Sequence, residues 1–449
     1  MFQQTTGLKA SLTLAGFGIV LAATLCQSAE AATLCVNPKI ASCFSTIGAA
    51  VTAASAGDTI KVAVNTYKED VVINKSLSLI GADEGTTIID ATGKSNGIFV
   101  NGRVLPPAGI ANGDVILPGV SDVVISGFTV KNANFEGILV VNASDVTISG
   151  NHVTGNNKSL ITGPLSCPGL PSFETNEGDD CGEGIHLMGV DHSTVASNEV
   201  DQNAGGILIS DETAPNHDNL ITGNSVHNNN YDCGITLASH APAPLLPGAG
   251  PTGQAPALPF GIYHNTISGN NSSYNGLFNP GAGAGVGIFA PFPGTKNWGN
   301  VVVGNTMSFN GLPGFTMHNH AWSALAPAVN MNDNVIVGNT ITRNAADTDD
   351  AATPGTTGIN IFSVAPVTGT IISQNHIEQE AVNVAIHGPI TVEVHLNDFD
   401  SATIGVDNIG GATINATQNW WNCTAGPNAT GCATTVGAMV STPWLTSPF

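Results

Sequence analysis

Basic residues are scarce in this sequence. Only 10% of its 449 residues are charged, and 33 acidic residues stand against 11 basic ones. Two of the basic residues are arginines, Arg103 and Arg343. Nucleic-acid binding depends on clustered Lys and Arg, so this composition argues against a nucleic-acid partner. The acidic balance also argues against gripping a polyanion by Coulomb attraction unless a bridging cation takes part.

Long apolar runs are also lacking. The stretch Leu12–Leu25 is too short to cross a membrane and no later run is longer. Lys9 precedes this stretch and Ala29-Glu30-Ala31 follows it, which is the pattern of a signal peptide. Leu25 is too large for a lipoprotein processing site at Cys26. We therefore expect residues 1–32 to be removed and residues 33–449 to be secreted, to the periplasm or the exterior, as one domain that does not span a membrane.

The cysteines lack any Cys-x-x-Cys spacing, which argues against a zinc knuckle or a thioredoxin-like dithiol. Export permits disulfides, and three pairs that are close in sequence suggest themselves. These pairs are Cys35–Cys43, Cys167–Cys181 and Cys423–Cys432. Cys233 is left without an expected partner.

Two alternating repeats indicate the fold. One is a six-residue unit with Asn in its fourth place and apolar residues at both ends, and Ile125–Val130 has Phe128 in the Asn place. The Asn residues are spaced by 47, 26, 41, 40, 34, 36, 22 and 22, so the shortest coil has 22 residues and the others carry insertions. The units are Ile148–Val153, Val195–Val200, Ile221–Val226, Ile262–Ile267, Val302–Met307, Ile336–Ile341, Ile372–Ile377, Val394–Phe399 and the segment around Asn419.

The second repeat is a Gly followed by alternating apolar residues. Strands of this kind bury every second side chain, as a parallel solenoid requires. We expect the Asn residues of successive coils to stack into a ladder at a bend. The expected fold is an all-β, single-stranded right-handed parallel β-helix. The repeat begins at Gly137, Gly184, Gly206, Gly234, Gly287, Gly314 and Gly358.

Both ends of the mature chain are expected to cover the solenoid core. Residues 33–60 include Phe44–Ala54, whose apolar residues have helical spacing and predict an N-terminal helical cap. Residues 419–449 hold Asn419-Trp420-Trp421 and Trp444 and are expected to form the C-terminal cap.

The opening segment, the Asn-Trp-Trp and the Gly426-Pro427 that follows it resemble those of exported bacterial right-handed β-helix proteins of the pectin-lyase-like superfamily. That superfamily includes pectate lyases, polygalacturonases, alginate epimerases, tailspike proteins and copper-site accessory proteins of nitrous oxide reductase. The resemblance covers nearly all of the mature chain. It implies the fold and leaves the function open, because one scaffold carries many chemistries.

A candidate site follows from the expected coil register. Glu212, His240 and His320 each lie six residues beyond a repeat Gly, so stacked coils bring them into one row with Asp211 beside them. We take these four as candidate catalytic residues, because a His between carboxylates acts as acid or base near neutral pH. His186, which lies two residues beyond its Gly, and the pair His217-Asp218 are candidates for substrate binding. The alternative is that these are ordinary polar turn residues.

Metal binding is a further expectation. His318 and His320 alternate along an extended segment and are able to chelate one cation. Gly178-Asp179-Asp180-Cys181 resembles a piece of polygalacturonases, but the Gly-His-Gly and Arg-x-Lys motifs of that family are missing. We expect this loop, like that of Asp347, Asp349 and Asp350, to be an acidic surface loop that holds at most a divalent cation such as calcium.

Three functions fit these features. The first is a carbohydrate-active enzyme, of lyase, hydrolase or epimerase type, that acts on a polysaccharide or cell-surface glycan as a monomer. The second is a non-catalytic β-helix that binds glycans or a surface. The third is a periplasmic metal-handling factor, suggested by 12 histidines.

Overall fold

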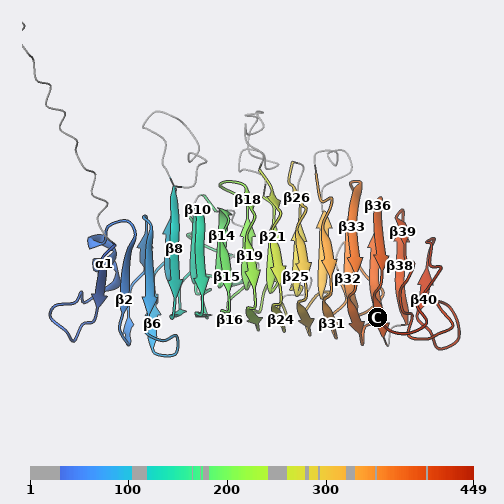
Figure 1. The fold of residues 1–449 in the computed structure, drawn as a ribbon, viewed down its shortest axis with the longest axis horizontal. Coiled ribbons are helices and arrows are strands. Elements are labelled where there is room, and N and C mark those ends of the chain that lie inside the picture. Colours follow the sequence, from blue (N-terminus) through green and yellow to red (C-terminus); the bar gives the residue numbers. More distant parts are fainter. Residues whose placement is uncertain are drawn as a thin grey trace, which may run out of the picture.

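The computed structural model describes residues 31–103, 119–163, 165–171, 173–174, 182–240, 260–278, 283–291, 294–319, 329–348, 351–400 and 403–449. Short strands stack along one axis in chain order, and Figure 1 shows them as a row that runs from the N-terminal to the C-terminal end. Within the described residues, every strand pairing is parallel apart from one hairpin of β12 (Ile161–Thr162) and β13 (Leu165–Ser166). The protein is mostly β structure, as expected.

Three strand-bearing faces make up the stack. Each coil passes from a first face to a second and then a third, before it returns to the first one coil further on. The short strands β18 (Asn216–His217), β22 (Ile262–Tyr263) and β26 (Asn297–Trp298) pair at the corner between the first and second faces. The faces keep this order from coil to coil, so a residue's place in one coil fixes its neighbours in the next.

The first face contains the Gly strands of the repeat. Its members are β4 (Val71–Ile73), β7 (Ile98–Asn101), the first part of β10 (Ile138–Ser149), β14 (Ile185–Asp191), β17 (Ile207–Ser210), β21 (Ile235–Ala238), β25 (Val286–Phe289), β29 (Phe315–Asn319), β32 (Thr357–Ser363), β35 (Val382–His387), β38 (Ile404–Gly410) and β40 (Thr434–Val436).

The second face precedes the repeat Asn. Its members are β1 (Thr33–Val36), β2 (Asp58–Val62), β5 (Leu77–Gly81), β8 (Val120–Ser126), the last part of β10, β15 (Thr194–Ala196), β19 (Leu220–Thr222), β23 (Thr266–Ser268), β27 (Val301–Val303), β30 (Val335–Val337), β33 (Val367–Ser373), β36 (Ile390–His395) and β39 (Thr413–Asn415).

The third face follows the repeat Asn and forms a sheet of its own. Its members are β3 (Asn65–Tyr67), β6 (Thr87–Asp90), β9 (Thr129–Lys131), β11 (His152–Thr154), β16 (Glu199–Asp201), β20 (Ser225–His227), β24 (Asn271–Ser273), β28 (Thr306–Ser308), β31 (Thr340–Thr342), β34 (His376–Glu378) and β37 (Asp398–Asp400).

The core lies inside the coils and is almost wholly aliphatic. Alternate residues of each strand point inward, as Ile185 and Leu187 do in β14, and both are completely buried. Burial of an aliphatic side chain stabilises the fold by about 1.5–3 kcal/mol. Because the same residue types recur in every coil, this contribution repeats along the whole stack.

Buried Asn side chains form the expected ladder between the second and third faces. In each step the amide nitrogen of one Asn donates to the amide oxygen of the next, for example from Asn151 to Asn198 at 3.1 Å and from Asn198 to Asn224 at 3.0 Å. The ladder continues through Asn270, Asn305, Asn339, Asn375, Asn397 and Asn419.

Two further ladders lie at the other corners of the coil. One joins the third face to the first, and the other joins the first face to the second. Each buried amide thus satisfies backbone and side-chain groups that would otherwise be unpaired in the core. The first set is Asn156, Asn203, Asn229, Asn275, Asn310 and Asn344, and it ends on Glu380. The second set is Asn219, Asn265, Asn300 and Asn334.

Two registers predicted from the sequence are wrong. Asn270, rather than Asn265, continues the main ladder, so the spacings 41 and 40 become 46 and 35. Gly285, rather than Gly287, is the repeat glycine of its coil, because Gly287 aligns with Thr236 and Thr316. Phe289 therefore aligns with His318 instead of Thr316. Phe128 does occupy the Asn place, since its amide donates to Asn151 Oδ1.

The two ends of the stack differ. Of residues 33–60, which were expected to form a helical cap, only α1 (Ile47–Ala53) is helical, and it buries Ile47, Ala50 and Val51. Thr46 caps this helix by accepting from the amide of Ala49. At the other end Trp421 is completely buried and packs edge-on against Phe399, with ring centroids 5.1 Å apart.

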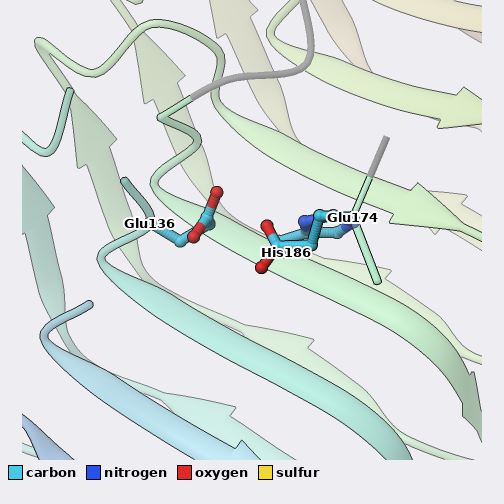
Figure 2. Close-up of side chains that lie close together, drawn as sticks. All are labelled: Glu136, Glu174 and His186. Carbon is cyan, nitrogen blue, oxygen red and sulfur yellow. The ribbon is translucent and has the colours of Figure 1, made fainter. Parts of the chain in front are cut away.

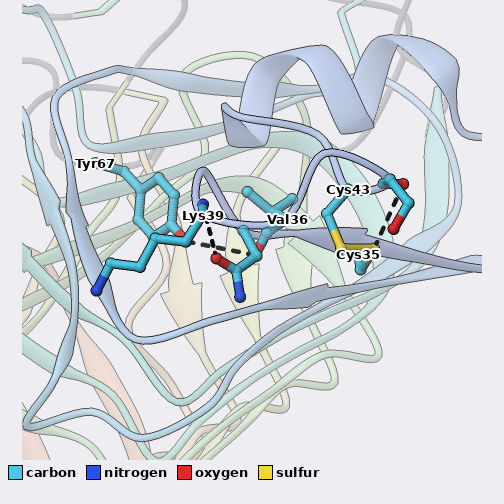
Figure 3. Close-up of a disulfide and its surroundings, with 7 residues drawn as sticks. Cys35, Val36, Lys39, Cys43 and Tyr67 are labelled. Atoms are coloured by element: carbon cyan, nitrogen blue, oxygen red, sulfur yellow. Dashed lines mark hydrogen bonds between the residues drawn. A yellow bond between two sulfur atoms is a disulfide. The ribbon is translucent and has the colours of Figure 1, made fainter.

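Two of the three predicted disulfides are confirmed, Cys35–Cys43 and Cys423–Cys432. Figure 3 shows the first, which joins β1 to the loop that follows it, with Tyr67 nearby. Cys167 is also disulfide-bonded, and its expected partner Cys181 lies outside the described residues. Cys233 is a buried free cysteine. The expected signal peptide, residues 1–32, lies outside the described part of the chain except for its last two residues.

Candidate functional site

Polar side chains are buried on the outer side of the first face. Strand alternation directs His186, Ser210 and Thr236 away from the core, yet their exposed fractions are 2%, 0% and 3%. On the second face, by contrast, the outward-facing Leu220 is 37% exposed. The outer side of the first face is therefore covered, and it is where the protein keeps titratable groups out of solvent.

Three of these titratable groups form a compact cluster. Ligand atoms of Glu136, Glu174 and His186 all lie within 4.8 Å of one another. Glu136 directly precedes repeat Gly137, His186 lies on β14 and Glu174 comes from the insertion before β14. Figure 2 shows the carboxyl groups of the two glutamates turned toward each other, with His186 beside Glu174.

The cluster extends to the next coil through Ser210 and Glu212. His186 Nε2 lies 2.9 Å from Ser210 Oγ, and Ser210 Oγ donates to Glu212 Oε2 at 3.2 Å. His186 Nε2 is also 3.9 Å from Glu212 Oε2. Imidazole, hydroxyl and carboxylate thus form a connected chain of proton donors and acceptors.

Glu212 in turn reaches His240, whose Nδ1 is 4.0 Å from Glu212 Oε1. Asp211 accepts from the backbone amide of His240 at 2.7 Å and from Ser239 Oγ at 3.0 Å. Of the four candidate catalytic residues, the structure therefore brings Asp211, Glu212 and His240 together. His320 lies outside the described residues.

The carboxyl groups of this site hold protons more tightly than usual. Burial raises the pKa of Glu136 and of Glu174, and each is raised further by the charge of Glu212. Glu136 also raises the pKa of its neighbour Glu174. Burial raises the pKa of Asp211 to about 7, against the opposing effect of His240. Two carboxyl groups in contact cannot both ionise in a buried site, so the glutamate pair holds at least one proton at neutral pH.

A cation lies beside the pair. The guanidinium of Arg103 is 3.8 Å from the ring centroid of Phe173, the residue before Glu174, and its charge opposes the rise in the pKa of Glu174. Phe173 stacks on Phe99 of β7 at 6.3 Å. Phe173 thereby anchors the insertion on a small apolar cluster of the first face. This cluster consists of Leu139, Val141 and Met188 with Phe99 and Phe173.

Glu136, Glu174, Ser210 and Arg103 were not predicted as site residues. Glu136 precedes a repeat glycine, as Glu183 does, so the position before each Gly was a signal in the sequence. Glu174 and Arg103 follow from no repeat, because Glu174 lies in an insertion and Arg103 lies just beyond β7.

Another buried histidine, His318, lies further along the same face. His318 Nε2 is 2.5 Å from Thr316 Oγ1 and 3.5 Å from Asp347 Oδ2, and Asn360 donates to Asp347 at 3.1 Å. The expectation that Asp347 belongs to a surface loop is wrong, since it is 2% exposed. Metal chelation by His318 with His320 stays a prediction, because His320 lies outside the described residues, as do Asp349 and Asp350.

His217 and Asp218 lie at the corner between the first and second faces. Both contact residues outside the cluster of Glu136, Glu174 and His186. The ring of His217 stacks on Tyr263 at 4.7 Å, and Tyr263 stacks on Trp298 at 4.5 Å. Asp218 Oδ1 is 3.8 Å from His264 Nδ1. His186 is thus the one predicted substrate-binding residue that the structure places in the cluster. The loop Gly178–Cys181 lies outside the described residues.

Three of these buried side chains are suitable ligands for a divalent cation. Glu136, Glu174 and His186 together offer two carboxylates and an imidazole nitrogen, and neither carboxylate oxygen of Glu136 has a hydrogen-bond partner of good geometry. Such a set is typical of transition metals, whereas calcium takes six to eight oxygen ligands. Calcium at this site stays a prediction.

Comparisons with known proteins agree with the fold. Residues 79–245 match the family model described as right handed beta helix region. No curated protein matches the sequence. The matched residues therefore have the sequence pattern of a right-handed β-helix region, in agreement with the fold. Within the described residues, no helix is long and apolar enough to span a bilayer.

Three solved structures are similar to this chain at low identity. DFA-IIIase from Arthrobacter chlorophenolicus A6, solved without its lid and in complex with GF2, is 13% identical, with 92% of this chain and 99% of that chain covered and a TM-score of 0.50. Alginate lyase from Paenibacillus sp. str. FPU-7 is 13% identical over 77% and 95% of the two chains, with a TM-score of 0.47. The mannuronan C-5 epimerase A-module of Azotobacter vinelandii is 13% identical over 89% and 94%, with a TM-score of 0.42.

Proposed function

We propose that this protein is a carbohydrate-active enzyme whose active site is the cluster around Glu136, Glu174 and His186. The observation that carries the proposal is a buried carboxyl pair that holds at least one proton beside an imidazole. A carboxyl group that stays protonated at neutral pH is a general acid, and a nearby ionised group is the matching base. DFA-IIIase, one of the similar solved structures, was determined in complex with GF2.

Among lyase, hydrolase and epimerase chemistry, the carboxyl pair favours hydrolysis. Cleavage of a glycosidic bond uses one carboxyl group to protonate the leaving oxygen and a second to activate water or attack the sugar. Glu174, the most exposed of the three residues at 9%, protonates the leaving oxygen. Glu212, which is linked to His186 through Ser210, accepts the proton of the attacking water.

The surrounding charge favours a neutral glycan. The net charge is -22, and within the cluster Arg103 is the cation that acts on Glu174. Lyase and epimerase reactions need a cation or basic group to neutralise a uronate and a base for its α-proton. Arg103 packs on Phe173 next to several carboxyl groups. Its single positive charge is too little to neutralise the many carboxylates of a polyuronate.

A glycan-degradation screen tests this proposal. Wild-type protein is incubated with neutral and uronate-containing polysaccharides, with and without EDTA, and new reducing ends and unsaturated products are measured. E174Q and H186A should each lower the rate by about 10²–10⁴-fold, the usual effect of a general acid or base. E378Q, a change at an exposed glutamate of the third face, is the matched control. Undiminished activity in E174Q would remove the proposal, and release of unsaturated products would replace hydrolysis by elimination.

We also propose that the chain is exported to the periplasm or the exterior as a monomer, after loss of residues 1–32. Residues 33–449 then form one domain, with α1 and residues 419–449 as its caps. The disulfides Cys35–Cys43 and Cys423–Cys432 support export, because such bonds persist in oxidising compartments. N-terminal sequencing of the protein recovered from outside the cytoplasm should begin at or near Thr33. A full-length chain in the cytoplasm would contradict this.

A further inference from the structure

A second group of metal-ligating side chains lies on the third face, apart from the proposed active site. His152 on β11 is the register partner of Glu199 on β16, and Asp201 on β16 is the register partner of His227 on β20. The residues between them, Val153, Val200 and Val226, are completely buried in the core. Strand alternation therefore directs all four polar side chains outward from three consecutive coils on a rigid base.

The distances between these side chains suit a metal ion. His152 Nε2 is 2.9 Å from Asp201 Oδ1, and His227 Nε2 is 3.4 Å from Glu199 Oε1. Ligand atoms of His152, Glu199 and Asp201 all lie within 4.8 Å of one another. Tetrahedral ligands at about 2.1 Å from a zinc ion lie about 3.4 Å apart, which is close to the spacing of these three residues. His227 lies beside Glu199 and completes a four-ligand site when its ring turns toward the other three.

The four side chains are open to ions in solution. Their exposed fractions are 31% for His152, 50% for Glu199, 10% for Asp201 and 25% for His227. Their register neighbours in the adjoining coils are small, with Thr129 before His152 and Ser273 after His227. An ion therefore reaches the group without any movement of the backbone.

We propose that His152, Glu199, Asp201 and His227 bind one divalent transition-metal ion of the Zn²⁺ class. Two imidazoles and two carboxylates are the donors that such ions prefer, whereas Ca²⁺ and Mg²⁺ prefer oxygen ligands alone. The two carboxylates balance the charge of a divalent ion. Asn228 Nδ2 lies 2.9 Å from His227 Nδ1 and orients that ring.

The electrostatics of the group support a cation. The hydrogen bond to Asp201 raises the pKa of His152 against the opposing effect of burial. The charges of Asp201, Glu199 and Glu84 raise it further. The imidazole thus lies in a negative potential that favours a positive charge. These side chains should bind a divalent metal ion more tightly than a proton, because the ion contacts both histidines and both carboxylates at once.

Calorimetric titration of the EDTA-treated full chain with Zn²⁺ tests the proposal. Wild-type protein should bind one Zn²⁺ ion that the double variant H152A/H227A does not bind. The loss of affinity should exceed the about 10–100-fold that removal of an outer-shell partner causes. H192A is the matched control, because His192 pairs with a single carboxylate, Asp191, at 2.7 Å. Binding by wild type and the double variant with the same stoichiometry and affinity would overturn the proposal, as would no Zn²⁺ binding by wild type.

Two further measurements distinguish the third-face metal site from the proposed active site and from a failure to fold. Co²⁺ should give the visible absorption of a tetrahedral complex in wild type and in E174Q, since the latter change affects only the proposed active site. E199Q, a change at a half-exposed side chain, serves if the double variant fails to fold, as judged by thermal unfolding. Loss of the Co²⁺ spectrum in E174Q but not in E199Q would assign the metal to the first face and refute the third-face site.

Discussion

At the residue scale, the carboxyl pair and its neighbours illustrate how burial converts ordinary side chains into reactive ones. Glu136 is fully buried, and Glu174 and His186 are 9% and 2% exposed. A carboxylate without solvent is unfavourable, so the glutamates keep a proton unless a cation compensates. The same effect appears at a third buried carboxyl, Glu380, which lies far from the cluster and has a purely structural place in the ladder.

Glu380 offers a test of this effect on stability. It takes the place of an Asn in a ladder, where Asn344 donates to it at 3.1 Å, and burial raises its pKa from 4.5 to about 7. A raised pKa in the folded state means that stability is full below pH 4.5 and is lost as pH rises through 7. E380Q, which keeps the shape and acceptor, should therefore stabilise the protein at pH 8 by up to about 3 kcal/mol and have no effect at pH 4.

Urea unfolding of E380Q and wild type at both pH values measures this difference. E378Q, a change at an exposed neighbour on the third face, should alter stability at neither pH. A variant E380Q that is less stable than wild type at pH 8 would show that the ionised carboxylate is the favoured form in the ladder.

Cys233 should be inert in the native protein. It is 1% exposed, burial raises the pKa of its thiol, and the amide of Ala284 donates to its sulfur at 3.3 Å. Thiolate is the reactive form, so a thiol reagent should label one cysteine per mature chain only after denaturation. Rapid labelling of the native protein would show that this coil opens to solvent.

At the element scale, stability depends on ladders of identical residues. Asn224 illustrates this, because it accepts from Asn198, donates to Asn270 at 2.9 Å and also donates to the carbonyl of Val195. N224A leaves buried donors and acceptors without partners, and each such group costs about 1–3 kcal/mol. The melting temperature of N224A should fall accordingly. N271A, on the exposed side of β24, should be nearly neutral, and an equal loss in both variants would argue that the ladder adds nothing specific.

The errors in the predicted register have a physical origin at this scale. The three ladders lie five residues apart within a coil, as in Asn219, Asn224 and Asn229. Each corner residue follows a short strand of similar composition, so the sequence pattern alone does not distinguish Asn265 from Asn270. Gly285 and Gly287 are ambiguous in the same way, since both precede an apolar residue. The packing of one coil on the next determines which Asn joins the main ladder and which Gly begins the strand. This packing is seen only in the structure.

The candidate site was predictable in the part that follows the repeats. Glu212 and His240 lie six residues beyond successive repeat glycines, and the structure places them side by side. Glu174 and Arg103 come from segments outside the repeats, and their positions depend on the docking of Phe173 against Phe99. No local pattern contains such a contact. The catalytic roles of all these residues stay predictions.

At the scale of the whole molecule, the stack of coils turns a long chain into an ordered surface. Figure 1 shows one elongated row of strands, and the first face presents its outward side chains along that row. Glu136, His186 and Glu212 are separated by up to 76 residues in the chain, yet stacking brings them together. An elongated monomer should sediment as a single species, more slowly than a sphere of 45.5 kDa. Concentration-dependent sedimentation would instead indicate assembly.

The central claim is that coil stacking creates a carboxyl group that stays protonated at neutral pH on the outer side of the first face. Carbon-13 NMR of protein labelled at the glutamate carboxyl carbon tests it directly, in an E380Q background that removes the other glutamate with a raised pKa. We predict carboxyl intensity at the protonated position at pH 7 that is weaker in E174Q and in E136Q and absent from the double variant E136Q/E174Q. A spectrum in which every glutamate carboxyl is already ionised at pH 7 would contradict the account.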